Sequence, residues 1–339
     1  MPSKFPGSPL VMTPGEPGGI APEITAKAWA ALREDEGNAF FLIGDAAHVE
    51  RRASDAGLAV PIRIIATAQE AKAAFNTALP VLQRPLPCRP VTGAFATEAA
   101  PWVMATIEEA VTLCLAGAAD GIVTCPIQKE ALYAAGFPHQ GHTDYLAQLA
   151  RNHGREATDV MMLVGGGLRA VPVTVHIALK DVPSALTRET ILAQARVVHA
   201  ALIKNFGIAR PRIAVTGLNP HAGENGAMGS EEIDTIIPAI KALQQQGLNV
   251  RGPMPADTAF FPQERGAYDA ILCMYHDQAL IPVKTLDFDG GVNVTLGLPF
   301  IRTSPDHGTA LGLAGTGKAS ANSLIAAIRL ARQMADASA

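Results

Sequence analysis

Short apolar runs alternate with Ala-rich stretches of helical periodicity along most of the chain. The runs are short and rich in β-branched or large apolar residues, as buried strands are, and they lie at 40–45, 61–65, 121–124, 170–176, 212–216 and 270–275. Helical spacing fills the intervals between them, most clearly at 97–116, 187–206, 230–246 and 321–337. This alternation predicts an α/β fold with a mostly parallel sheet flanked by helices.

The length of the chain predicts two domains. It has 339 residues, and domains usually contain about 100–200 residues. Because 48% of the residues are hydrophobic, two domains of this size can each bury a core, which excludes intrinsic disorder. The sequence has no internal repeat and no low-complexity linker. We therefore expect two domains that share a sheet or exchange strands, with the chain crossing between them more than once.

Charge and hydropathy exclude several classes of partner. The net charge is −4 and there is no basic block, so nucleic acid and anionic membranes are poor candidates. No stretch of about 18 apolar residues lacks charge or proline, and residues 1–7 contain no apolar signal core. The cysteines are scattered and form no CxxC pair; they are Cys88, Cys114, Cys125 and Cys273. We expect a reduced, cytoplasmic protein.

Three histidines follow three of the predicted strands. His176 and His276 each close a strand, and His221 follows residues 212–216 through a short turn. Ligands of open α/β sheets bind outside the carboxyl ends of the strands, so the three imidazoles should reach one edge. A single histidine at a strand end is more often a hydrogen-bonded loop residue than a ligand. The shared placement of three favours a site for a divalent ion such as Zn²⁺, Co²⁺ or Ni²⁺.

Polar neighbours of these histidines could orient them. Glu224 lies three residues after His221, and Asp277 and Gln278 follow His276. Such groups commonly hydrogen-bond metal-ligating imidazoles.

Two further patterns are typical of anion binding. Residues 141–144 (GHTD) precede an apolar helical run, so Thr143 or Asp144 can cap a helix whose N-terminus favours an anion. Downstream, sparse polar residues interrupt apolar or Gly-rich sequence; they are Lys284, Asn293 and Arg302. Their placement suggests contacts to a phosphate or carboxylate, although isolated Lys and Arg residues are usually solvated surface.

The Gly-rich segment 306–318 does not fit an ATP site. Residues 312–318 match GxxxxGK, but Ala319 stands where a phosphate-binding loop needs a Mg²⁺-binding Ser or Thr, and no strand directly precedes it. There is also no GxGxxG after the first strand. A glycine-rich cradle before a helix that begins near Ser320 or Asn322 still fits a nucleotide. Residues 13–19 form a tight turn that could provide a wall of the substrate or cofactor site.

Six segments together resemble the 4-hydroxythreonine-4-phosphate dehydrogenase family of vitamin B6 biosynthesis. They are 13–17 (TPGEP), 141–143 (GHT), 218–224 (LNPHAGE), 255–258 (PADT), 274–278 (MYHDQ) and 291–304 (GVNVTLGLPFIRTS). The resemblance extends from about Val11 to the last helix. Residues 307–310 and 314–319 also resemble the cofactor loop of isocitrate and isopropylmalate dehydrogenases.

The resemblance implies the architecture of those dehydrogenases. This is a pair of α/β/α three-layer domains with a cleft between them, in a homodimer. On this basis we expect residues 1–140 plus 285–339 to form the larger domain, with the cofactor loop. Residues 141–284 would form the second domain, with the metal ligands and the dimer contacts.

The resemblance also assigns roles to individual residues. The metal ligands, contributed from both subunits, would be His176, His221 and His276. The substrate contacts would be His142, Thr143, Lys284, Asn293 and Arg302. The cofactor loop would use His307, Gly308, Thr309, Gly315, Gly317 and Asn322. Lys129 and Asp257 are candidates for the general base, together with a metal-bound water. Cys125 and Gln128 depart from the family pattern, in which Gly and His are expected, whereas Lys129 is kept.

The implied activity is the metal-dependent oxidation and decarboxylation of 4-phosphooxy-L-threonine. The products would be 3-amino-2-oxopropyl phosphate, CO₂ and NADH or NADPH, with one Zn²⁺, Co²⁺ or Mg²⁺ per site. A close alternative is a dehydrogenase of a related acid, such as threonate or erythronate 4-phosphate. A three-His metallohydrolase would keep the metal and need no dinucleotide. A phosphate acyltransferase of related fold would leave the histidines unexplained, and a non-catalytic binding protein usually carries a secretion signal.

Overall fold

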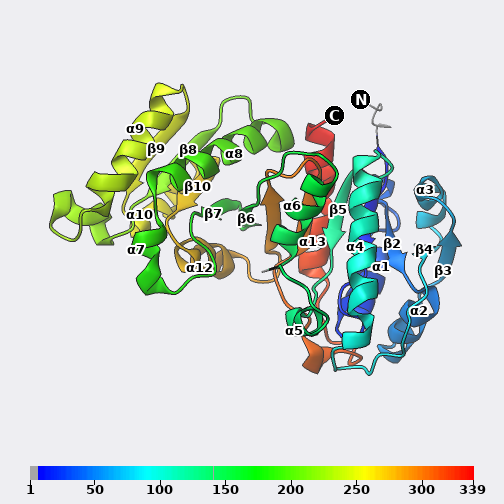
Figure 1. Cartoon of the computed structure of the whole chain (residues 1–339). Coiled ribbons are helices and arrows are strands. Elements are labelled where there is room, and N and C mark those ends of the chain that lie inside the picture. Colours follow the sequence, from blue (N-terminus) through cyan, green and yellow to red (C-terminus); the bar gives the residue numbers. More distant parts are fainter. Residues whose placement is uncertain (1–6, 140) are drawn as a thin grey trace. The chain divides into compact units, whose positions relative to one another are not determined.

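The computed structural model describes residues 7–139 and 141–339, and the chain forms two compact units (Figure 1). The first unit contains the residues up to 159 together with 298–337, and the second contains 160–297. The chain therefore passes between the units twice. The boundaries predicted from the sequence lie earlier, after residue 140 instead of 159 and after residue 284 instead of 297. The difference arises because helix α6 (His142–Asn152) packs its Leu146 and Leu149 into the core of the first unit.

The first unit contains an all-parallel sheet of order β3-β4-β2-β1-β5-β12. Its strands are β1 (Leu10–Thr13), β2 (Phe40–Gly44), β3 (Ile62–Ile65), β4 (Leu79–Gln83), β5 (Gly121–Thr124) and β12 (Ile301–Pro305). Strands β1, β2 and β5 are buried along their whole length. A parallel sheet covered on both faces produces such continuous apolar runs, and this is why β2 and β5 were predicted from the sequence, whereas β1 was not.

Helices cover both faces of this sheet. They are α1 (Ala21–Leu32), α2 (Ala46–Asp55), α3 (Ala71–Phe75), α4 (Ala100–Leu115), α5 (Lys129–Ala134), α6 and α13 (Asn322–Ala337). On one face, Val103 and Ile107 of α4 share a core cluster with Val11 of β1. On the other, the Thr25 hydroxyl of α1 contacts Met12 Sδ at 3.4 Å. Alternate residues of β1 thus face the two helical layers.

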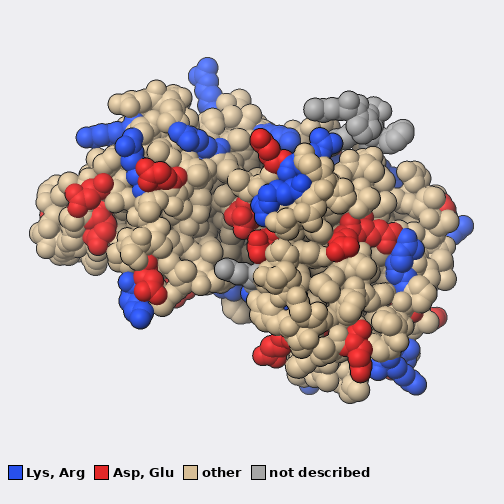
Figure 2. Space-filling model, viewed as in Figure 1, with Lys and Arg blue, Asp and Glu red and all other residues tan. Residues whose placement is uncertain are grey.

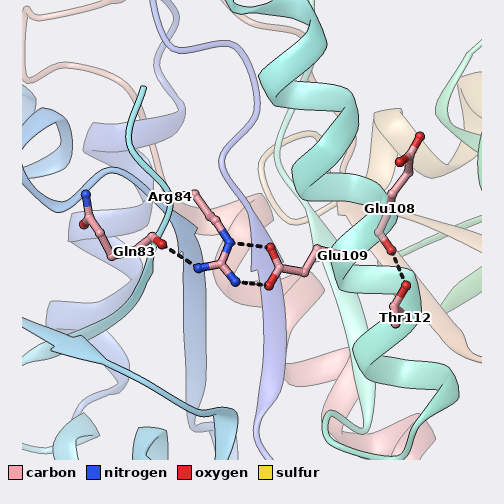
Figure 3. A network of polar contacts seen from close by, with 5 residues as sticks. All are labelled: Gln83, Arg84, Glu108, Glu109 and Thr112. Carbon is pink, nitrogen blue, oxygen red and sulfur yellow. Dashed lines mark hydrogen bonds and ion pairs between the residues drawn. The ribbon is translucent and has the colours of Figure 1, made fainter. Parts of the chain in front are cut away.

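An ion pair connects the residue that follows β4 to helix α4. Arg84, just after β4, binds both carboxylate oxygens of Glu109, and it also donates to the backbone oxygen of Gln83 (Figure 3). On the same helix the Thr112 hydroxyl donates to the Glu108 backbone oxygen at 2.9 Å, while the Glu108 carboxylate accepts from Tyr145 Oη of α6 at 2.7 Å. The bond between Tyr145 and Glu108 links α6 to α4.

The second unit has a mixed sheet of order β11-β6-β7-β10-β8-β9, in which β6 runs antiparallel to both of its neighbours. Its strands are β6 (Val160–Gly165), β7 (Leu168–Pro172), β8 (Arg212–Thr216), β9 (Asn249–Met254), β10 (Ala270–Cys273) and β11 (Val292–Leu296). Its helices are α7 (Val182–Ala185), α8 (Arg188–Phe206), α9 (Ile237–Gln245), α10 (Ala256–Ala259), α11 (Pro262–Arg265) and α12 (His276–Leu286).

This sheet is also covered on both faces. Helix α12 packs its Ala279, Leu280 and Val283 against one face, and α8 and α9 contact each other over the other. Each unit is therefore a three-layer α/β/α structure, and the predicted fold class is confirmed.

Several predicted elements differ from the observed ones in where they begin or end. Strand β7 stops at Pro172 and β10 at Cys273, so the strands predicted at 170–176 and 270–275 were too long. The helix predicted over 230–246 contains a π-helical turn at Glu232–Ile236 before α9.

Two surface properties agree with the composition. Within 7–139 and 141–339, no helix is both long and apolar enough to cross a membrane. On the face drawn in Figure 2, basic and acidic side chains are interspersed, and the described residues form no broad basic area there.

Candidate active site

Arg302 places a positive charge inside the first unit. It lies on β12, and its Nε and Nη2 atoms donate to Thr124 Oγ1, at the end of β5, over 3.1 and 2.7 Å. The side chain is 3% exposed, and burial lowers the pKa of the guanidinium from 12.5 to about 10. Arg302 therefore remains a cation at neutral pH. Because a buried cation is costly without compensation, such a position favours the binding of an anion.

His142 adds a neutral imidazole beside this cation. It is the first residue of α6, and burial lowers its pKa well below 6.5, helped by the nearby charges of Arg302 and Lys129. Its Nε2 atom is buried and has no hydrogen-bond partner among the residues that the structure describes. Buried polar atoms are nearly always satisfied, so this nitrogen is available to a ligand.

Lys129 and the start of α6 complete the group. Lys129 begins α5, and a Cβ atom built on Gly141 would lie 3.6 Å from its Nζ. Gly141 occupies the N-cap position of α6 without a side-chain hydrogen bond, so the predicted cap by Thr143 or Asp144 is wrong. Helix α6 begins earlier than expected, and both residues lie in its first turn. The positive end of the α6 helix dipole adds to the attraction for an anion.

The predicted cofactor loop is anchored in the first unit at both of its ends. Near its start, Thr309 Oγ1 donates to Gln128 Oε1 over 2.8 Å, and the Thr309 backbone oxygen accepts from Ile20 N over 3.1 Å. Near its end, Lys27 Nζ of α1 donates to the backbone oxygens of Gly317 and Ala319 over 2.7 and 2.6 Å. Hydrogen bonds therefore fix both ends of this loop to the first unit.

Two glycines of this loop have conformations that require glycine. Gly315 and Gly317 have φ angles of +76° and +69°, and a Cβ on Gly317 would lie only 2.6 Å from the backbone oxygen of Ala56. Gly308, by contrast, faces open space. His307 Nε2 is buried without a partner among the described residues, and Asn322 is exposed at the start of α13. An open glycine beside an unsatisfied nitrogen fits a loop that receives a polar ligand.

The turn at residues 13–19 supports the predicted cofactor loop through the neighbouring Ile20, which contacts Thr309. The Pro17 backbone oxygen lies 3.0 Å from His48 Nε2 and 3.1 Å from Arg52 Nη1, and Arg52 Nη2 donates to Gly19 O over 3.0 Å. Burial lowers the pKa of His48 from 6.5 to about 4, so its ring is neutral. Because Ile20 contacts Thr309, α2 fixes the position of the loop through this turn.

The sequence analysis did not identify Lys27, Arg52 or Gln128 as supports of this loop. Lys27 is the only basic residue within 21–32, and this isolation in an apolar helix is the one signal that could have indicated it. Arg52 lies in a polar stretch and Gln128 was noted only as a departure from the family.

In the second unit, β10 lies between β7 and β8, and the three predicted metal ligands follow these strands. The rings of His176 and His276 have centroids 5.8 Å apart. His276 is the first residue of α12, and its Nδ1 atom lies 2.7 Å from Asp277 Oδ1, which leaves Nε2 on the other side of the ring. Both histidines lie beyond the strand ends, because β7 and β10 are shorter than predicted.

His221 occupies an unusual backbone. Residues 221–225 all have positive φ, between 43° and 76°, so they form a left-handed turn. Four of these five residues are not glycine, and that conformation is unfavourable for them. Among the described residues no group of three or more His, Cys, Asp or Glu side chains is arranged to hold a metal. The structure thus brings His176 and His276 together and does not join His221 to them.

A buried carboxylate supports the segment that leads into this turn. Glu232 is 2% exposed, and its Oε1 atom accepts from the backbone N–H groups of Leu218 and Asn219, each over 2.8 Å. Its Oε2 atom accepts from Asn219 Nδ2 over 3.0 Å. These bonds offset part of the cost of the left-handed turn.

The other predicted residues of the second unit lie on three different elements. Asp257 is exposed in α10, and Lys284 lies in the last turn of α12 with its Nζ atom 6.0 Å from the centroid of the Phe288 ring. Asn293 is on β11, and its Oδ1 atom is buried without a hydrogen-bond partner among the described residues. The other predicted substrate contacts, His142, Thr143 and Arg302, belong to the first unit.

Comparisons with known proteins show which family the chain resembles. Residues 36–331 match the sequence model of the family described as pyridoxal phosphate biosynthetic protein PdxA. The chain is 52% identical over 336 residues to the 4-hydroxythreonine-4-phosphate dehydrogenase of Bradyrhizobium diazoefficiens, covering 97% of each chain. It is 53% identical to the protein of that name from Caulobacter vibrioides, covering 96% of this chain and 97% of the other. A crystal structure described as the Klebsiella pneumoniae enzyme superposes with a TM-score of 0.87 at 39% identity, covering 98% of this chain and all of that one.

Proposed function

The chain belongs to the family of pyridoxal phosphate biosynthetic protein PdxA, and from this premise we propose that it is a 4-hydroxythreonine-4-phosphate dehydrogenase. It oxidises and decarboxylates 4-phosphooxy-L-threonine to 3-amino-2-oxopropyl phosphate and CO₂, with NAD or NADP as the oxidant. The observation that carries the substrate assignment is the group of Arg302, His142 and Lys129, in which two cations flank a neutral imidazole with an unsatisfied nitrogen.

This group binds the anionic end of the substrate. Arg302 supplies a fixed positive charge, and the unsatisfied nitrogen of His142 forms a hydrogen bond to the ligand. Thr143 and the N-terminus of α6 add to the attraction for the anion. Lys284 and Asn293 are also proposed substrate contacts, and the unsatisfied Oδ1 of Asn293 supports this role.

The nicotinamide cofactor binds at the loop that contains His307, Gly308, Thr309, Gly315, Gly317 and Asn322. The open position at Gly308 and the unsatisfied Nε2 of His307 support this assignment. When bound, the cofactor accepts the hydride from C3 of the substrate, and the resulting β-keto acid loses CO₂. The C3 hydroxyl proton passes, directly or through water, to Asp257 or to Lys129, which can serve as the base only in its neutral form.

A divalent ion, Zn²⁺, Co²⁺ or Mg²⁺, would be held by His176, His221 and His276, contributed from both subunits of the proposed homodimer. The short separation of the His176 and His276 rings and the contact of His276 Nδ1 with Asp277 support this, because metal-ligating imidazoles usually bind a carboxylate through their other nitrogen. When bound, the ion supplies Lewis-acid stabilisation of the negative charge that develops on the substrate.

The enzyme acts as a homodimer in which both subunits contribute to each site. Exposed apolar side chains lie close in sequence to the histidines of the second unit and support a partner there; they are Ile177, Leu179, Ile281, Leu286 and Phe288.

An assay of the purified protein tests this function. It should produce NADH or NADPH from 4-phosphooxy-L-threonine, lose this activity on chelation, and regain it on addition of Zn²⁺ or Co²⁺. Threonate and erythronate 4-phosphates should be turned over much more slowly in parallel reactions. Undiminished activity of metal-free protein would contradict the role of the ion, and a preference for either acid would contradict the substrate. Phosphate-ester hydrolysis without dinucleotide would instead identify a metallohydrolase.

A further inference from the structure

A buried carboxamide joins two of the segments that carry the histidines. Gln278, in the first turn of α12, is 9% exposed. Its Oε1 atom accepts from Met274 N, just after β10, and from Thr216 Oγ1, at the end of β8, each over 2.7 Å. Its Nε2 atom donates to Gly217 O over 2.8 Å. The side chain therefore binds the backbone on both sides of the gap between β8 and β10.

These bonds begin where strand pairing ends. Strands β8 and β10 pair from Ala270 opposite Ile213 to Leu272 opposite Val215. The strand pairing ends there, before the segments that lead to His221 and His276. Gln278 contacts the next residues on each side, Thr216, Gly217 and Met274. It thus continues the connection between the strands by two further residues, up to the segments that carry the histidines.

The third segment is attached to the same point. The Thr174 hydroxyl donates to Met274 O over 2.8 Å, and Val173 N donates to Cys273 O over 2.7 Å. These bonds continue the β7–β10 pairing to within two residues of His176. Met274 thereby links to Gln278 through its N–H group and to Thr174 through its carbonyl.

We propose that Gln278 is a positioning residue that fixes the His221 and His276 segments relative to each other before a divalent ion binds. It does not touch the ion, and its effect is to reduce the ordering that binding requires. This proposal rests on the proposed function, in which the three histidines hold that ion. It differs from the expectation that Gln278 orients an imidazole directly, because its side chain hydrogen-bonds Thr216, Gly217 and Met274 rather than a histidine ring.

The variant Gln278→Met tests this, because it keeps the volume of the side chain and removes all three hydrogen bonds. Its matched control is Gln244→Met in the same unit, where Gln244 Nε2 donates to Val250 O over 2.8 Å, away from the histidines in the sequence. Affinity for Co²⁺ is measured by titration of its visible absorption, and for Zn²⁺ by competition with a chromophoric chelator. NAD affinity and the circular dichroism spectrum are recorded on the same samples.

We expect Gln278→Met to bind both ions about 10–100-fold more weakly, with an unchanged NAD affinity, while Gln244→Met binds them as the wild type does. Equal ion affinity in folded Gln278→Met and wild type would overturn the positioning role. Should Gln278→Met not fold, Gln278→Glu replaces it, because the carboxylate keeps both accepting positions and removes only the donor to Gly217. A wild type that binds neither ion would refute the metal site itself, and that result is distinct from the failure of the positioning role alone.

Discussion

The two units differ in whether the functional side chains or the groups that support them are buried. In the first unit the functional group itself is buried, since Arg302 is 3% exposed and lies within the sheet. In the second unit the groups are accessible, and what is buried is their support: Glu232 is 2% exposed and Gln278 is 9% exposed, whereas His176 and His221 are exposed.

The difference in burial follows from the ligand that each unit is proposed to bind, an anion in the first and a metal ion in the second. A buried cation attracts an anion strongly because little water screens its charge. A metal ligand must instead expose a ring nitrogen, so it cannot be fixed by burial and depends on the hydrogen bonds of the segment that carries it. Loss of the group should therefore reduce activity in the first unit, whereas loss of the support should reduce stability in the second.

The largest effect is expected for Arg302→Met. Loss of the charge-assisted bonds to the substrate should lower kcat/KM by about 1000-fold, which corresponds to about 4 kcal/mol. Because a buried charge contributes little to folding, the free energy of unfolding should stay within about 1 kcal/mol of the wild type or rise. Steady-state kinetics and urea unfolding measure both. A variant that loses stability and keeps activity would reverse the comparison.

The next largest effect is expected for Glu232→Ala. Two backbone N–H groups lose their acceptor and the Asn219 amide loses one of its two, so the free energy of unfolding should fall by about 3 kcal/mol. The neighbouring Glu231→Ala is the control, because the Glu231 carboxylate accepts from the Asn219 side chain and not from the backbone of this segment, and it should cost less than about 1 kcal/mol. Equal losses in urea unfolding would show that Glu232 has no special role in supporting the His221 turn.

A pH dependence of stability should come from the buried His48 of the first unit. Its pKa is about 4 in the folded chain and 6.5 when unperturbed, so between these pH values the unfolded chain binds a proton that the folded chain does not. Stability therefore falls as the pH falls through this window, by about 2 kcal/mol from pH 7 to pH 5. His48→Gln retains a donor for Pro17 O but does not titrate. Its urea-unfolding curves should lose that part of the dependence, and an unchanged dependence would contradict the assignment.

The smallest effect is expected for Lys27→Met, which releases the backbone oxygens of Gly317 and Ala319. We expect the KM for NAD to rise about tenfold, or about 1.4 kcal/mol, with kcat within about twofold of the wild type. Lys27→Arg, which keeps the charge and the donors, should restore most of the affinity. If KM stayed constant and kcat fell, Lys27 would not act through the cofactor loop.

The sequence predicted the parts of the fold that hydrophobic burial determines. Residues 40–44 and 121–124 are buried strands, and their apolar runs were sufficient to locate them. Strand β12 was not predicted because its buried residues Arg302, Thr303 and Ser304 are polar, so the segment that contributes to the site lacks the pattern of a core strand.

The left-handed turn at 221–225 could not be predicted for a related reason. Ala222 and Glu224 are not residue types that indicate positive φ, and the bonds that support the turn come from Glu232, about ten residues later. The histidines were found because their residue type marks them. Their supports, Glu232 and the bonds of Gln278, became evident only from the three-dimensional structure.

X-ray absorption of the protein loaded with one equivalent of Zn²⁺ tests the central assignment most directly. The account predicts a single environment with three imidazole nitrogens at about 2.0 Å. Each of the variants His176→Ala, His221→Ala and His276→Ala should remove one of those nitrogens or abolish binding. A zinc ion bound without imidazole, or an unchanged spectrum in any of the three variants, would contradict it.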